Sequence, residues 1–199
     1  MVSRATGRAI GRRPGSQPTR QNIVDAARGI FAAEGFRGAT LRAIAEAADV
    51  DPALIRHYFG TKDQLFAAAM EFPDDAPDRL LAALAGDPST AGARLTRAYL
   101  ELWEDPATRN QMLIATRASL GSDQAMARVR PTIEHMLGQA ATTDLPGPDA
   151  QKRFALAMAH LLGIATVRHL SKVPPLRDLP FGELIASTAP AIQLHLTDT

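Results

Sequence analysis

The segment 40–62, TLRAIAEAADVDPALIRHYFGTK, constrains the fold of this chain more than any other stretch. From Leu41 to Ala48, apolar residues recur at the spacing of one helical face. The next residues leave room only for a tight turn. Asp51 followed by Pro52 is a strong signal for the start of a new helix. The aspartate carboxylate can accept hydrogen bonds from the unpaired amide groups of the first turn, and proline has no amide hydrogen that would need a partner there. The pattern predicts two short helices joined by a short turn.

This layout is typical of a helix-turn-helix, which places its second helix in the major groove of DNA. An amphipathic helix over residues 19–34 precedes it, and Gly35 is suited to end that helix. Thr61 and Gln64 form a capping box that opens a fourth helix, to about Met70. We therefore expect a DNA-binding domain over residues 19–66.

The remaining sequence also has helical patterns, so we predict an all-α fold. An N-terminal three-helix helix-turn-helix domain would precede a C-terminal helical bundle over residues 67–199. We expect this bundle to serve ligand binding and dimerisation. Hydrophobic residues make up 46% of the chain, and 14 prolines punctuate it as at many helix ends. Pro131 and Pro190 fall inside expected helices, where kinks or breaks are expected. Residues 119–122 are expected to form a loop. The expected bundle helices are 77–85, 89–104, 106–120, 122–141, 149–171 and 181–196.

Charge is distributed unevenly along the sequence. Residues 1–60 hold nine arginines against five acidic residues, although the whole chain carries only +1. A basic N-terminal part of this kind is expected when that part of the protein binds the phosphates of DNA. We predict that residues 1–18 form a basic disordered arm. This arm could be a solvated tail, or its arginines, among them Arg12 and Arg13, could contact DNA.

Composition also excludes several classes of protein. The chain has no cysteine, so disulfides, thiol catalysis and cysteine-zinc sites are excluded. The N-terminus lacks the apolar region of a signal peptide, and no run approaches the roughly 18 apolar residues of a membrane span. We expect a cytoplasmic, nucleoid-associated protein without a membrane partner.

The motifs of residues 19–66 resemble the TetR family of bacterial one-component transcriptional regulators. The resemblance rests on Gly35-Phe36, on Thr40 as a cap, on His57-Tyr58-Phe59 and on Thr61-Lys62. It implies a homodimeric repressor that binds a palindromic operator on double-stranded DNA and is released by a small molecule. Many members place tyrosine where this chain has Arg56, so the operator sequence does not carry over.

The candidate DNA contacts are the exposed positions of this unit. A helix N-terminus favours phosphate, and the start of a recognition helix lies nearest the base edges. Phe59 is expected in the core, and at least one of Leu54 and Ile55 should be. The candidates, with the two arm arginines, are Arg12, Arg13, Thr40, Arg42, Asp51, Pro52, Ala53, Arg56, His57, Tyr58 and Lys62.

The bundle offers two further groups of candidates. Tryptophan and methionine inside a helical bundle suit an adaptable apolar pocket, although each such residue can equally be plain core. The pocket candidates are Leu95, Tyr99, Trp103, Met112, Met136, Phe154 and Met158. The expected helix 149–171 is apolar on more than one face, which favours a dimer interface shared with 181–196. The interface candidates are Leu161, Leu162, Val167, Leu184 and Ile192.

Three functions compete at this point. The first is a repressor released by a small apolar effector. The second is an architectural or activating DNA binder with no inducer, whose bundle would be a solid dimer core. The third is a small all-α enzyme, for which the sequence offers no convergent titratable groups. No histidine pair has metal-ligand spacing, so neither a metal nor a cofactor is expected.

Overall fold

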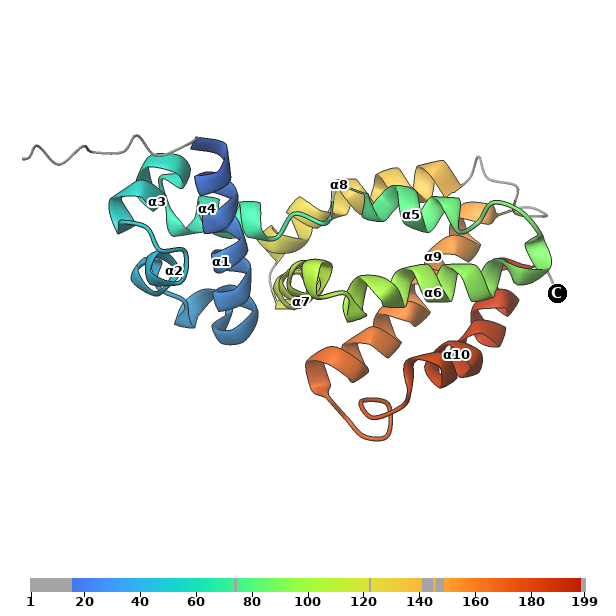
Figure 1. The fold of residues 1–199 in the computed structure, drawn as a ribbon. Coiled ribbons are helices and arrows are strands. Elements are labelled where there is room, and N and C mark those ends of the chain that lie inside the picture. The colour runs from blue at the N-terminus through green and yellow to red at the C-terminus, as the bar shows by residue number, and fades with distance from the viewer. Residues whose placement is uncertain (1–15, 74, 122, 141–144, 146–148, 198–199) are drawn as a thin grey trace, which may run out of the picture.

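A computed structural model describes residues 16–73, 75–121, 123–140, 145 and 149–197. The described part is helical and contains no strand, which confirms the all-α fold. Among the described residues, four helices gather at one end of the molecule and six at the other (Figure 1). The first group comprises α1 (Ser16–Gly38), α2 (Leu41–Ala47), α3 (Pro52–Phe59) and α4 (Lys62–Ala69). The second comprises α5 (Ala76–Ala82), α6 (Ala91–Glu104), α7 (Pro106–Gly121), α8 (Asp123–Ala140), α9 (Ala150–Ala165) and α10 (Phe181–Leu196).

Local capping sets the ends of the short N-terminal helices. The Ala43 amide donates to Thr40 Oγ1 over 3.1 Å, and the Ala53 amide donates to Asp51 Oδ1 over 2.7 Å. Both side chains therefore satisfy amide groups that the first turn leaves free. Gly35 interrupts α1 with a φ of 69°, a left-handed conformation that glycine adopts without a Cβ clash. The starts of α2 and α3 match the predicted caps. Helix α1 does not match its expected span of 19–34, because it runs from Ser16 to Gly38 and so includes residues 16–18 of the expected arm.

The capping box of α4 is also present. The Gln64 amide donates to Thr61 Oγ1 over 3.2 Å, and the Thr61 amide donates to Gln64 Oε1 over 3.1 Å. Two free amide groups are thus satisfied reciprocally. Helix α4 therefore starts at a fixed point directly after α3.

A hydrophobic cluster holds the N-terminal helices together. It includes Ile23 and Phe31 of α1, Ile44 of α2, Ile55 of α3 and Leu65 of α4, all at most 1% exposed. Burying a side chain of this size contributes roughly 1.5–3 kcal/mol. The cluster also includes residues of α7 and α8, so the helix-turn-helix is packed against the bundle.

A second hydrophobic cluster fills the bundle, where α6 crosses α10 closely. A Cβ on Gly92 of α6 would lie 2.5 Å from the backbone nitrogen of Gln193 of α10. The Gly92 amide donates to Gln193 Oε1 over 2.7 Å, and Gln193 Nε2 donates to the Pro88 carbonyl over 2.8 Å. Pro88 belongs to a short 3₁₀ turn, Pro88–Thr90, just before α6. The absence of a side chain at position 92 therefore lets these two helices touch.

Helix α9 continues into a π-helical segment, Thr166–Ser171, as expected from the single span 149–171. By length and composition, Ala150–Ser171 is the one described stretch that could cross a membrane, with a mean hydropathy of 1.3 over its most apolar 18 residues. Only 22% of that window is buried within one chain. An apolar helix with so little cover leaves a face for another partner to occupy.

Pro131 and Pro190 lie inside α8 and α10, and neither helix is broken there. The loop expected at residues 119–122 is wrong. Ser119 is not in a loop, because α7 continues to Gly121. Its hydroxyl donates to the Ala115 carbonyl over 2.7 Å, one turn back along the helix. The serine thus bonds back to its own helix, and α7 remains helical through this stretch.

Candidate nucleic-acid interface and internal cavity

Helix α3 turns one face into the protein and the other to solvent. Ile55 and Phe59, one turn apart, are buried in the N-terminal cluster. Pro52, Arg56 and His57 are exposed, and α3 lies at the outer end of the molecule, away from the bundle (Figure 1). The prediction that Phe59 and one of Leu54 and Ile55 belong to the core is confirmed. The helix is thus fixed by its inner face and presents a polar outer one.

The exposed arginines of this face are Arg42 and Arg56. Among the described residues, neither Arg42 nor Arg56 forms an ion pair, in contrast to Arg97 in the bundle, whose Nη1 lies 3.8 Å from Glu101 Oε1. Thr40, Asp51 and Ala53 are exposed beside them. Guanidinium groups without a carboxylate partner remain available to phosphate oxygens or base edges.

Tyr58 and Lys62 are half-buried rather than free. Lys62 Nζ lies 4.7 Å from the centroid of the Phe36 ring, a cation–π contact that holds the ammonium group beside α1. The Tyr58 ring meets the His57 ring edge-on, with centroids 5.3 Å apart. Arg12 and Arg13 lie outside the described residues.

The bundle contains a partly open apolar cavity of about 270 Å³. Five of the seven predicted pocket residues line it, namely Tyr99, Met112, Met136, Phe154 and Met158. Burial raises the pKa of the Tyr99 hydroxyl well above its usual range, so this group stays protonated. No charged side chain lines the cavity among the residues that the structure describes. The cavity therefore favours an uncharged, mainly apolar occupant.

Three hydroxyl-bearing residues, Thr116, Ser119 and Thr132, add polar points to this cavity. Sequence reasoning missed them because single serines and threonines in helices carry no periodic signal. Leu95 and Trp103 do not line the cavity. Both are fully buried, and the Trp103 ring stacks on His169 with centroids 5.4 Å apart.

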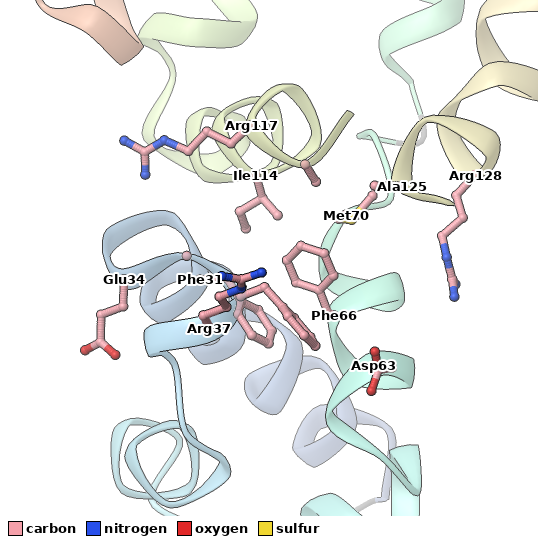
Figure 2. A pocket seen from close by; sticks show the side chains of 13 residues that line it. Phe31, Glu34, Arg37, Asp63, Phe66, Met70, Ile114, Arg117, Ala125 and Arg128 are labelled. Carbon is pink, nitrogen blue, oxygen red and sulfur yellow. The ribbon is translucent and has the colours of Figure 1, made fainter. Parts of the chain in front are cut away.

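A larger, open groove of about 600 Å³ lies between the helix-turn-helix and the bundle. Figure 2 shows Phe66 and Ile114 inside it and charged residues, among them Arg128 and Asp63, around it. Across this seam Arg117 of α7 donates a hydrogen bond to the Ala32 carbonyl of α1. The cavity within the bundle suits a small apolar ligand better than this larger groove does, because the groove is lined by charged residues.

The predicted dimer contacts are mostly used within one chain. Leu161, Leu184 and Ile192 are at most 1% exposed, which leaves none of these side chains for a second chain to touch. Leu162 lines the cavity, and Val167 is half-buried in the π-helical segment. The large apolar side chains that remain exposed on the described parts of α9 and α10 are Leu156 (48%) and Leu194 (64%). Periodicity indicated apolar faces but could not tell core from interface, because α9 is apolar on more than one face.

The fold and its exposed recognition helix define a helix-turn-helix DNA-binding protein with a helical C-terminal domain. Two family models match the chain, "Bacterial regulatory proteins, tetR family" over residues 23–69 and "Tetracyclin repressor-like, C-terminal domain" over residues 89–196. The chain therefore belongs to the TetR family of bacterial transcriptional regulators.

Curated relatives match in the N-terminal domain. The HTH-type transcriptional regulator UidR of Escherichia coli is 40% identical over 53 residues, which span 27% of this chain and 27% of UidR. The HTH-type transcriptional repressor AcnR of Corynebacterium glutamicum is 45% identical over 56 residues, or 27% of this chain and 30% of AcnR. The matches thus span less than a third of each relative's length.

Solved structures match over nearly the whole chain. A TetR-family regulator from Streptomyces coelicolor A3 is 34% identical, with a TM-score of 0.64, over 95% of this chain and 100% of that one. GusR from Salmonella enterica is 16% identical, with a TM-score of 0.67, over 92% of this chain and 97% of that one, which shows a shared fold.

Proposed function

We propose that this protein is a homodimeric repressor that binds a palindromic operator through α3 and leaves it when a small apolar effector fills the bundle cavity. The proposal rests chiefly on Arg56, which is exposed, forms no ion pair with any described residue, and stands on a helix whose inner face is buried through Ile55 and Phe59. The recognition surface comprises Thr40, Arg42, Asp51, Pro52, Ala53, Arg56, His57, Tyr58 and Lys62.

The chemistry of this surface suits duplex DNA. Thr40 and Arg42 stand at the start of α2, where a helix N-terminus and a guanidinium favour the same phosphate. Pro52 and Ala53 are small, so the start of α3 approaches base edges without obstruction. Arg56 can pair in a bidentate manner with guanine O6 and N7 in the major groove.

A dimer would use the uncovered faces of α9 and α10. Leu156 and Leu194 are large, apolar and exposed on these two helices, and most of the apolar window of α9 is unburied. Packing this face against a second copy removes apolar surface from water. A twofold axis through such an interface would pair two α3 helices with two half-sites of a palindrome.

The cavity supports an effector. Its 270 Å³ is close to the lower end of the roughly 300–1,000 Å³ of typical ligand pockets. A solid bundle core, as the alternative without an inducer requires, would have no such cavity. The absence of lining charges among the described residues points to a neutral molecule, held by apolar contacts and a few hydroxyl groups.

Helix α7 can connect the cavity to the DNA-binding domain. One face of α7 supplies Met112 and Thr116 to the cavity. Its other face supplies Ile114 to the N-terminal cluster and the Arg117 hydrogen bond to α1. A ligand that prefers a shifted α7 would therefore favour a different placement of α3, and DNA release follows as a population shift.

Selection of bound sequences from a random duplex pool tests this proposal. We expect enrichment of one palindrome, bound by two chains, and release of that duplex by members of a panel of small neutral apolar compounds. Enrichment of a non-palindromic site bound by one chain would exclude the dimer. A selected duplex that no cavity-binding compound releases would instead favour a regulator without an inducer.

A further inference from the structure

We propose that His160 and His195 form a binding site for a divalent transition metal ion that links α9 to α10. His160 Nδ1 and His195 Nε2 lie 3.2 Å apart, although the residues are 35 positions apart in the sequence. Both side chains are partly buried and belong to packed neighbouring helices. This inference does not rest on the proposed repressor function.

The spacing of the two nitrogens matches the bite of a metal ion. Two imidazole nitrogens at 2.0–2.1 Å from a tetrahedral zinc ion are separated by roughly 3.3–3.4 Å. The observed distance between the two nitrogens, 3.2 Å, is slightly shorter, and a small rotation of the two side chains would bring it to that value. The rings meet at 75°, with centroids 5.5 Å apart, so they do not stack and both can turn towards a shared ion.

The donor set defines the class of metal. Two neutral imidazoles suit Zn²⁺, Ni²⁺ and Cu²⁺, whereas Mg²⁺ and Ca²⁺ prefer oxygen ligands. No group of three or more metal-ligating side chains occurs within the described ranges, so water completes the coordination shell. The site is therefore open and exchanges its ion, unlike a closed structural zinc site.

The site has a defined position in the fold. His160 is one helical turn from Leu156, and His195 follows Leu194, the two exposed leucines of α9 and α10. A bound ion would fix the separation of these helices beside that apolar face. Sequence spacing could not show the pair, because neither histidine has a second ligand nearby on its own helix.

Calorimetric titration of the untagged, chelator-treated full chain with Ni²⁺ or Zn²⁺ at about pH 8, where free imidazole is neutral, tests the site. We expect one ion per chain in the wild type. His160→Gln and His195→Gln should each lose this saturable binding. A His57→Gln/His135→Gln variant, which removes two exposed histidines elsewhere, should retain it.

A second readout needs no variant. Zn²⁺ should protect His160 and His195, and not His57, from carbethoxylation mapped by mass spectrometry of peptides. With Cu²⁺, electron paramagnetic resonance should show coupling to two nitrogens. Absence of saturable binding in the wild type, or unchanged binding in both single variants, would overturn the site and leave the pair as an interhelical hydrogen bond only.

Discussion

The backbone amide of Gly92 donates a hydrogen bond to Gln193 Oε1 across the contact between α6 and α10, over 2.7 Å. The same glutamine donates to the Pro88 carbonyl, so one side chain links both the start of α6 and the turn before it to α10. The geometry depends on the missing side chain at position 92, where a Cβ would lie 2.5 Å from the α10 backbone.

Gly92→Ala is therefore expected to destabilise the fold by roughly 1–3 kcal/mol, because two helix backbones must separate. Urea denaturation followed by circular dichroism measures this change in the free energy of unfolding. Gly138→Ala is the matched control, since a Cβ there meets nothing within 4 Å. That variant should be stabilised by roughly 0.5–1 kcal/mol, because alanine is the better helix former. Equal effects of both substitutions would refute the role of the crossing.

Stability should fall in mild acid through His169. Burial lowers the pKa of His169 from 6.5 to about 4, against the opposing influence of Glu104. Because the unfolded chain takes up the proton first, stability is full above about pH 6.5 and is lost as the pH falls towards 4. Between pH 7 and 5 this group accounts for at most about 2 kcal/mol. His169→Phe, which can keep the stacking on Trp103, should show a correspondingly smaller loss by urea denaturation at the two pH values.

If the exposed leucines Leu156 and Leu194 form the dimer interface, a charged residue in place of either one should dissociate the dimer. Leu156→Arg or Leu194→Arg should convert the dimer to a folded monomer, because an arginine in an apolar interface must lose its hydration. Sedimentation velocity and circular dichroism check mass and fold together. Val173→Arg alters an equally apolar residue, 48% exposed in the loop after the π-helical segment, and should leave the dimer intact. A wild-type chain that sediments as a monomer would contradict the interface.

Filling the cavity should separate effector response from DNA binding. Met158→Trp places a larger side chain into the 270 Å³ space and is expected to retain operator affinity while losing release by apolar compounds. Fluorescence anisotropy of a labelled operator duplex, with and without compound, measures both properties. Val173→Trp, outside the cavity, should respond as the wild type does. Retained release by the Met158 variant would place the effector elsewhere.

Much of the architecture could be predicted because local signals determine it. The caps at Thr40, Asp51 and Thr61 lie next to the apolar runs they start, and the structure contains all three. Part of the inner face of α3 could be predicted as well, since Phe59 and at least one of Leu54 and Ile55 were expected in the core, and the structure buries Phe59 and Ile55.

Contacts between distant segments could not be predicted in the same way. Leu161 and Leu184 have the composition of an interface, yet they pack in the core, because periodicity shows that a face is apolar and not what covers it. The pairing of His160 with His195 depends on how α9 packs against α10, which no local pattern encodes. Ser119 shows the related error, in which a polar run was expected to form a loop although the helix continues through it.

Arg56 and His57 stand on the exposed outer face of α3, and we expect both to contact the DNA. The most direct measurement is the affinity of the Arg56→Ala/His57→Ala variant for the selected operator duplex, across a series of salt concentrations. We expect a loss of roughly 1–3 kcal/mol for each base contact removed, and a shallower salt dependence by about one unit for each phosphate contact. Arg97→Ala, which removes an exposed arginine of the bundle, should bind as the wild type does. A double variant that binds the operator with undiminished affinity and an unchanged salt slope would show that α3 does not contact the DNA through these residues.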